Sequence, residues 1–220
     1  MSKWTIYTLI IILIVSFLVR VPRLDFPLSY IFVWGDGTRD YLVANHIVKY
    51  KEYPLTGPYN LLFETGVRNS PIYFYLFSLL LLFSNNILFI SFIGIVLQLC
   101  NVVLIFLIGK KLFNLLVGAL AALIYALNPE IIKWSDFIWQ PNLMLSVSLL
   151  GLYLLIRNYL EKKYNFLVPS LILISLGVSL HSSALPWLLG FLVLTFLILK
   201  ENKQPSLKFL KFFLVIPLSL

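Results

Sequence analysis

The sequence predicts an all-α, polytopic transmembrane protein, because it is too apolar and too poor in charge for a soluble class. Of its 220 residues, 60% are hydrophobic and 12% are charged, whereas soluble domains are about 45–50% apolar and about 25% charged. The mean hydropathy of +0.95 and the many aromatic residues also exclude a disordered chain. The single cysteine, Cys100, excludes a disulfide framework and any cysteine-based metal site.

Uncharged stretches indicate where the chain crosses the bilayer, since a spanning helix needs about 20 apolar residues. The first span, about residues 4–20, leads into Arg20-Val21-Pro22-Arg23 without a small-residue cleavage site, which favours an uncleaved membrane helix over a secretory signal. We expect further spans at about 87–108, 112–128, 140–156, 166–181, 185–199 and 209–220. The sequence stops inside the apolar run that begins at Phe212, so we expect residues 1–220 to be the N-terminal part of one longer membrane module.

The topology depends on the apolar run from Pro71 to Phe83, which holds 13 residues. As a helix it would be about 20 Å long, against a hydrocarbon core of about 30 Å, so it either dips into the membrane or crosses it. If it dips, ten Lys and Arg residues and only two acids share one side, while seven bases and seven acids share the other. If it crosses, the basic excess falls outside the cell. Because Lys and Arg in loops favour the cytoplasm, we predict a dipping segment, a cytoplasmic N-terminus and an extracytoplasmic loop over residues 21–86. The net charge of +8 is then a topology signal, and it requires no nucleic-acid partner.

Candidate functional residues collect on the predicted outer face. The loop over residues 21–86 is far longer than the other connections, and long loops are usually functional. It contains Asp36 and Asp40, whose spacing of four would place both carboxylates on one face of a helix. A second outer connection runs from Asn128 to Asn142, and His181 lies at a third.

These residues also have structural interpretations. Asp36 could cap the helix, with its neighbouring glycines shaping the turn. His46 is more typical of an interfacial surface residue than of a ligand, and the tryptophans at 34, 134 and 139 fit membrane-interface anchors as well as sugar platforms. Residue types alone therefore predict an acid-bearing site at the outer membrane surface, but they do not indicate which reaction takes place there.

Three basic side chains, Arg39, Arg68 and Lys133, could hold a lipid phosphate near the membrane surface. Lys133 fits either that role or a headgroup contact. Arg68 precedes the dipping segment, where its planar guanidinium could grip phosphate oxygens in bidentate fashion. Alternatively, Arg68 pairs with Glu64 four residues earlier, as a helix-surface contact worth about 0.2–0.5 kcal/mol.

The order of these parts resembles the GT-C-fold glycosyltransferases that use polyprenyl-phosphate donors, particularly the dolichyl-phosphate-mannose protein mannosyltransferases and the bacterial aminoarabinose transferases. Their acidic motif after the first helix is similar to the stretch Asp36-Gly37-Thr38-Arg39-Asp40-Tyr41-Leu42-Val43-Ala44, in which Gly37 replaces the usual second acid. Their segment before the second span is similar to Asn69-Ser70-Pro71-Ile72-Tyr73-Phe74-Tyr75. Their short basic turn and the small-residue helix after it resemble Gly109-Lys110-Lys111-Leu112-Phe113 and residues 119–129. Asn142 in Trp139-Gln140-Pro141-Asn142 stands where many members carry an acid.

The resemblance implies a multi-pass cell-membrane glycosyltransferase that moves a sugar from a polyprenyl-phosphate-linked donor to a hydroxyl of a lipid, glycan or protein acceptor, with inversion, on the extracytoplasmic face. It implies catalytic carboxylates at Asp36, which takes the position of the family's essential acid and would serve as general base, and at Asp40, which would support it by orienting the acceptor or holding a cation. Together with the residues of the predicted outer loops, this gives the expected substrate-binding residues Arg39, Glu64, Arg68, Lys133, Trp139, Asn142 and His181. A divalent cation would fit this chemistry without being required by it.

The alternative is a transporter or flippase of lipid-linked sugars. Such proteins usually carry ionisable residues inside their spans, and the predicted spans contain no internal Asp, Glu, Lys or Arg. The long acid-bearing first loop also favours an enzyme.

Overall fold

The computed structural model describes residues 2–24, 35–58, 68–162 and 164–201. The regular elements of these residues are helices, which confirms the predicted all-α class. The chain divides into two compact units, one formed by residues 1–54 and 73–142 and the other by residues 55–72 and 143–220.

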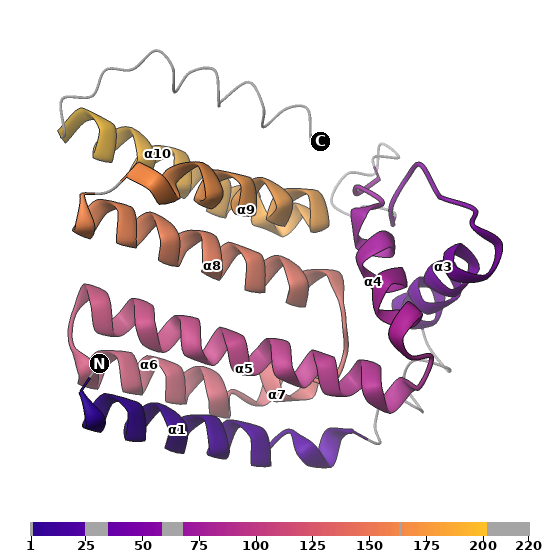
Figure 1. The fold of residues 1–220 in the computed structure, drawn as a ribbon, viewed down its shortest axis with the longest axis horizontal. Coiled ribbons are helices and arrows are strands. Elements are labelled where there is room, and N and C mark those ends of the chain that lie inside the picture. The colour runs from indigo at the N-terminus through magenta and orange to yellow at the C-terminus, as the bar shows by residue number, and fades with distance from the viewer. Residues whose placement is uncertain (1, 25–34, 59–67, 163, 202–220) are drawn as a thin grey trace. The chain divides into compact units, whose positions relative to one another are not determined.

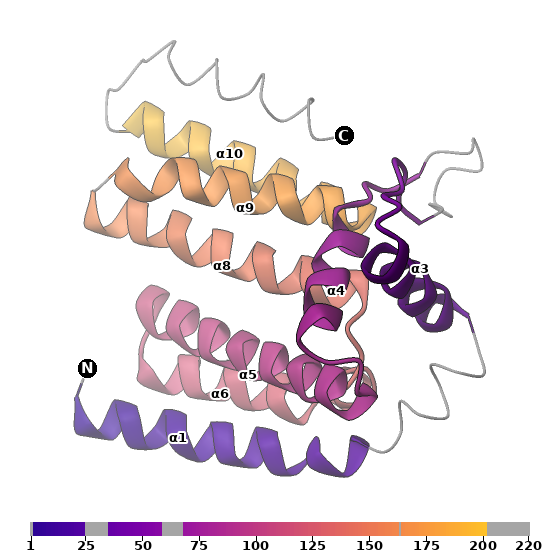
Figure 2. The same cartoon turned by 45° about the vertical axis from the view of Figure 1, so that its right-hand side comes forward.

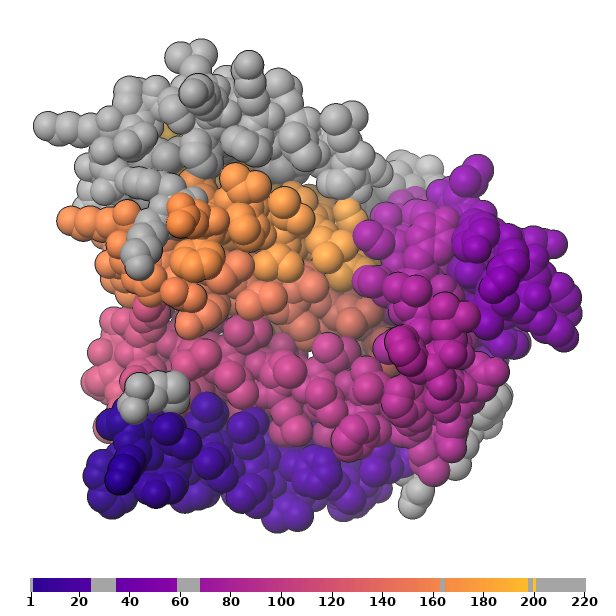
Figure 3. Space-filling view, in the orientation of Figure 1, coloured from indigo at the N-terminus to yellow at the C-terminus, as the bar shows by residue number. Residues whose placement is uncertain are grey.

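Three helices form the framework of the first unit (Figure 1). They are α1 (Lys3–Leu18), α5 (Ile87–Leu112) and α6 (Leu115–Leu127), and each begins at a polar cap. Ser2, Asn86 and Asn114 supply these caps, each accepting a hydrogen bond from a backbone N–H of the first turn. Their shared core consists of Ile12, Val102, Phe106, Ala122 and Ala126. The side chains of α1 and α5 meet along the face shown in Figure 3.

A polar cluster also joins α5 to α6. The Tyr125 hydroxyl donates to Gln98 Oε1 over 2.6 Å, and Asn101 Nδ2 donates to the Tyr125 oxygen over 3.1 Å. Gln98 and Asn101 are buried. Within an apolar helix pair such hydrogen bonds fix the register, because a slip would leave buried polar groups without partners.

The end contacts of these helices show that α1 runs antiparallel to α5 and parallel to α6. Lys110 Nζ, near the end of α5, lies 3.4 Å from Thr5 Oγ1 at the start of α1. Arg20 Nη1, just after α1, donates to the carbonyl of Ala126 at the end of α6 over 2.8 Å. The connection between α1 and α5 therefore starts and finishes at the same end of the helices, which is the arrangement that a dipping segment requires.

Short helices of this connection lie at that end. They are the 3₁₀ turn η1 (Val21–Arg23), α3 (Asp36–Tyr50) and α4 (Ile72–Phe83), and α7 (Pro129–Lys133) follows α6 there. Figures 1 and 2 show α3 beside α4, and the rings of Tyr41 and Phe77 pack edge to face with centroids 6.4 Å apart. The long first connection thus builds a helical layer at one end of the membrane helices.

The second unit consists mainly of α8 (Gln140–Glu161) from residue 143 onward, α9 (Leu167–Leu180) and α10 (Leu185–Glu201). The 3₁₀ turns η2 (Tyr164–Phe166) and η3 (Ser182–Ala184) connect them. Gly151 of α8 packs against the Ser170 carbonyl of α9, so these two helices approach closely. Residues 57 and 69 of this unit are joined by a backbone hydrogen bond of 2.8 Å.

The helix bounds differ from the predicted spans in detail. Residues 3–23, 87–112 and 140–161 are long and apolar enough to cross a membrane, whereas α4, α6, α9 and α10 are shorter apolar helices. The gap predicted between the spans 87–108 and 112–128 is placed too early: α5 continues to Leu112, so most of the predicted basic turn over Gly109–Phe113 is helical, and the break falls at Phe113 and Asn114, whose side chain caps α6. Lys110 and Lys111 instead occupy the last turn of α5, where positive charge is favoured by the helix dipole. The predicted span 209–220 lies outside the described residues.

Candidate active site

The first turn of α3 carries the predicted acidic pair. Gly35 precedes the helix with φ of 80°, a conformation open mainly to glycine, and Asp36 is the first helical residue. The interpretation of Asp36 as the N-cap is therefore wrong, because Gly35 holds that position and contributes no side-chain cap. The Asp36 carboxylate is 53% exposed, at a helix start where the dipole favours negative charge.

Arg39 joins the two acids of this turn. Its Nη1 lies 2.8 Å from Asp36 Oδ1, and its Nη2 and Nε lie 2.7 and 2.8 Å from Asp40 Oδ1. The spacing of four thus places both carboxylates on one helix face as predicted, with a guanidinium between them. Arg39 is 39% exposed, and these contacts use three of its five N–H groups, so the others can meet an anion.

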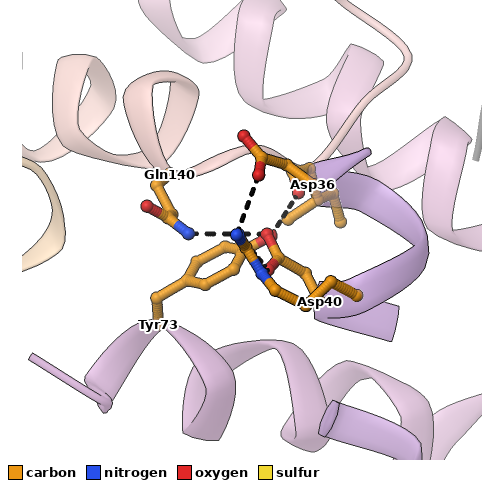
Figure 4. Close-up of polar contacts among 6 residues, drawn as sticks. Asp36, Asp40, Tyr73 and Gln140 are labelled. Carbon is orange, nitrogen blue, oxygen red and sulfur yellow. Dashed lines mark hydrogen bonds and ion pairs between the residues drawn. The ribbon is translucent and has the colours of Figure 1, made fainter. Parts of the chain in front are cut away.

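Asp40 differs from Asp36 because its side chain is completely buried. Gln140 Nε2 donates to Asp40 Oδ2 over 3.4 Å, and the Tyr73 hydroxyl lies within hydrogen-bonding reach of the same carboxylate. That hydroxyl donates to the Ile138 carbonyl over 2.8 Å. Figure 4 shows Asp36, Asp40, Tyr73 and Gln140 converging from α3, α4 and the start of α8.

Burial is the main influence on the ionisation of Asp40. It raises the pKa of this carboxyl from 3.8 to about 6, while the charge and hydrogen bonds of Arg39 act in the opposite direction. Loss of hydration thus outweighs the ion pair, as is common for buried carboxyls. One turn of helix therefore offers an accessible carboxylate, a buried carboxyl that titrates near neutrality and a partly exposed guanidinium.

The connection between α7 and α8 contains the other predicted residues of this unit. Lys133 Nζ lies 3.9 Å from Glu130 and 5.1 Å from the Trp134 ring centroid. Trp139 packs against Trp134 with centroids 5.5 Å apart. Asn142 Nδ2 donates to the carbonyls of Trp134 and Phe137, each over 2.8 Å, so this side chain holds the loop that ends at Gln140.

The remaining predicted residues lie outside the described part of the chain or outside the first unit. Glu64 lies outside the described residues, so its pairing with Arg68 is not tested. Arg68 and His181 belong to the second unit, and His181 Nδ1 contacts Ser183 Oγ at 2.8 Å while capping η3. His46 contacts Glu52 at 2.8 Å at the exposed end of α3, as expected of a surface residue. In the part of the chain that the structure describes, no three His, Cys, Asp or Glu residues are grouped to hold a metal ion.

Sequence reasoning missed several residues that the structure brings to this end of the unit. Tyr73 and Gln140 both lie in stretches that resemble family motifs. Their place in these motifs was the one feature of the sequence that could have identified them as site residues. Arg20 was expected in the basic flank of the first span, yet it is fully buried and donates to the Ser16 carbonyl, Ser16 Oγ and the Ala126 carbonyl. Its burial depends on the packing of α6, which no local pattern reveals.

Comparison with known proteins gives one match. The family model described as dolichyl-phosphate-mannose-protein mannosyltransferase matches residues 68–220. The matched region includes Tyr73 and Gln140 and begins after the acidic turn of α3. Searches of curated proteins and of solved structures find no significant match.

Proposed function

The chain belongs to the dolichyl-phosphate-mannose-protein mannosyltransferase family and is thus a membrane glycosyltransferase, and from this premise we propose that it uses a polyprenyl-phosphate-linked sugar donor. The sugar passes to an acceptor hydroxyl on the extracytoplasmic face, with inversion at the anomeric carbon. The observation that carries this proposal is the acidic turn of α3, where an accessible and a buried carboxyl flank Arg39.

Burial favours different roles for the two acids. The donor already has a good leaving group, so the main requirement is a base that takes the acceptor proton during attack. Asp36 is half-exposed and can reach an acceptor, so we assign it as this base. Asp40 is buried and cannot touch an acceptor without rearrangement, so we assign it a supporting role in holding Arg39.

The proposed step is a single displacement. The acceptor oxygen forms a bond to the anomeric carbon as the bond to the phosphate oxygen breaks, and the acceptor proton passes to Asp36. The departing lipid phosphate carries negative charge, which Arg39 is placed to stabilise. Arg68 and Lys133 remain candidate phosphate contacts, and Trp139, Asn142 and His181 remain candidate sugar or acceptor contacts.

The test measures release of free polyprenyl phosphate from a labelled donor by the purified protein in the presence of acceptor. Loss of a positioned base typically lowers the rate about 100- to 10,000-fold, so Asp36→Asn should lose most transfer while keeping its expression and membrane insertion. Glu52→Gln, at an exposed acid of the same connection, serves as the matched control. Near wild-type transfer by Asp36→Asn would refute the assignment, and a larger loss in Asp40→Asn would exchange the two roles.

One observation favours the transporter or flippase alternative. Arg20 ends the first predicted span fully buried, and ionisable residues at such positions in membrane proteins often mark a transport path. The same labelled donor separates the two classes, because a transporter would move it across a vesicle membrane without releasing polyprenyl phosphate.

A further inference from the structure

The segment between α7 and α8 is held at its start by Arg23, the last residue of the 3₁₀ turn η1. Arg23 Nη2 donates to the carbonyl of Lys133 over 3.0 Å, and Arg23 Nε lies 3.9 Å from Asp136 Oδ1. Asp136 is 3% exposed and Arg23 is 24% exposed. A carboxylate this deeply buried is retained at a loop position only with compensating contacts, and Arg23 supplies the positive charge.

Helix α5 fixes the middle of the same segment by direct backbone packing. A Cβ added at Gly94 would lie 2.9 Å from the Ser135 carbonyl oxygen and 3.1 Å from the Asp136 carbonyl carbon. Both distances are shorter than ordinary van der Waals contact. The segment is thus seated directly on α5, and the absence of a side chain at Gly94 allows this.

The far end of the segment carries the groups that contact the proposed active site. The Ile138 carbonyl accepts from Tyr73, and Gln140 donates to Asp40. Only one residue separates Asp136 from Ile138, and Asn142 closes the loop onto Trp134 and Phe137. A shift of Asp136 would therefore be transmitted to Ile138 and Gln140.

We propose that Arg23 and Asp136 are positioning residues that hold the segment from Trp134 to Gln140 so that Gln140 keeps its contact with Asp40. This inference rests on the proposed function for its effect on transfer, but the geometry it describes belongs to the fold. Arg23 and Asp136 act through Gln140, without touching substrate.

The groups around Asp40 determine how its pKa would respond if the segment from Trp134 to Gln140 were displaced. Asp40 faces Arg39 and Asp36 from its own helix, the Tyr73 hydroxyl from α4, and neutral Gln140 from α8. Because the Gln140 amide stabilises the charged carboxylate, its withdrawal should raise the pKa of Asp40 further above 6. Two or three backbone N–H donors lower the pKa of a carboxyl by about two pH units. The single, longer contact of Gln140 at 3.4 Å therefore bounds the expected change at about one pH unit.

The experiment compares Asp136→Asn, Gln140→Leu and the double variant. Two readouts are used: the acid limb of the pH–transfer profile, and the pH dependence of unfolding in detergent. Because the pKa of Asp136 is itself raised to about 6 by burial, the contribution of Asp40 to unfolding is taken in each background as the difference from the same protein carrying Asp40→Asn. Each single variant should move the Asp40 titration to higher pH by up to about one unit, and the double variant should move it no further because both changes remove the same contact. Glu130→Gln, an acid on α7 that is 76% exposed, is the matched control and should leave both profiles in place.

A second route displaces the segment without changing any charge. Gly94→Ala should produce the same shift through its clash with Ser135, while Gly190→Ala, whose added methyl meets no described atom within 4 Å, should not. This pair keeps the inference testable if Asp136→Asn fails to fold.

The readouts distinguish failure of this inference from failure of the proposed function. If the protein releases no polyprenyl phosphate under any condition, the transferase proposal fails, but the unfolding profiles still test the positioning. Wild-type titration of Asp40 in Asp136→Asn and in Gly94→Ala would overturn the inference, even if both variants were less stable. Additive shifts in the double variant would also overturn it, because they would show that Asp136 acts independently of Gln140.

Discussion

Asp36 and Asp40 show how the surroundings of a residue, more than its type, determine what it can do. They are four residues apart on one helix and share one arginine, yet one carboxylate is half-exposed and the other is completely buried. The buried carboxyl has its pKa raised to about 6 by the loss of hydration. The fold therefore retains at Asp40 a group whose ionisation opposes folding at neutral pH.

The stability of the protein should therefore depend on pH through Asp40. The folded-state pKa of about 6 lies above the ordinary value of 3.8, so the folded state binds the proton more tightly. The free energy of unfolding should fall as the pH rises from about 4 to about 7, by up to about 3 kcal/mol for this one group. The Asp40→Asn variant has no titrating group at this position. Its free energy of unfolding should therefore fall less than that of the wild type between about pH 4 and pH 7, by this same amount of up to about 3 kcal/mol.

Denaturant unfolding in detergent at a series of pH values would measure this difference. Asp136, whose pKa burial also raises to about 6, is present in both proteins, and its contribution cancels in the comparison. Parallel stability curves for wild type and Asp40→Asn would show that the Asp40 carboxyl titrates at an ordinary pH.

The sequence predicts the part of the site that depends on local spacing and misses the part that depends on packing. Asp36 and Asp40 share a helix face because helical periodicity requires it. Gln140 reaches Asp40 across one hundred positions of sequence, which no periodic pattern encodes. Asn142 was expected to bind substrate on its motif position, but its amide holds two backbone carbonyls of the preceding loop.

Helices α5 and α6 depend on a close approach between two glycines. A Cβ at Gly118 would lie 2.6 Å from the Phe106 carbonyl oxygen and 2.7 Å from the Lys110 nitrogen, both backbone atoms of α5. Gly109 of α5 approaches Gly118 in the same way. Small residues at such crossings let membrane helices gain dispersion contacts in the absence of a strong hydrophobic driving force.

Gly118→Ala should consequently destabilise the first unit. Backbone atoms cannot rotate away as a side chain can, so overpacking of about 1–3 kcal/mol should exceed the gain of up to about 1 kcal/mol from the higher helix propensity of alanine. Thermal unfolding in detergent would measure the loss, with Gly190→Ala as the control that keeps only the propensity gain. Equal stability of the two variants would contradict the close packing of α5 and α6.

Element boundaries were predictable where a polar cap was read together with the apolar run. Asn86 and Asn114 both cap helices, but charge alone placed the second break at Gly109–Lys111, several residues too early. Lysines at the end of a membrane helix can remain helical, because their long side chains reach the interface while the backbone continues. The cap, and not the first charge, marks where the chain turns.

The antiparallel arrangement of α1 and α5 indicates whether the connection from residue 21 to residue 86 crosses the membrane. If α4 crossed the membrane, α5 would have to run in the same direction as α1. The contacts of Lys110 with Thr5 and of Arg20 with Ala126 show that it does not. The interpretation of a dipping segment, chosen from charge distribution, thus agrees with a geometric feature that is independent of charge.

The final prediction concerns the side of the membrane on which the α3 end of the first unit lies. The acidic turn of α3 should face the outside, and the turn between α5 and α6 should face the cytoplasm with Lys110 and Lys111. In a background with Cys100 replaced by serine, Glu52→Cys should react with an impermeant thiol reagent in intact cells. Phe113→Cys, a 71% exposed residue in the α5–α6 turn, should react only after the membrane is opened. Both positions belong to the first unit, so the pair reports on one compact set of helices. Labelling of Phe113→Cys but not of Glu52→Cys would reverse the topology and place the acidic pair in the cytoplasm.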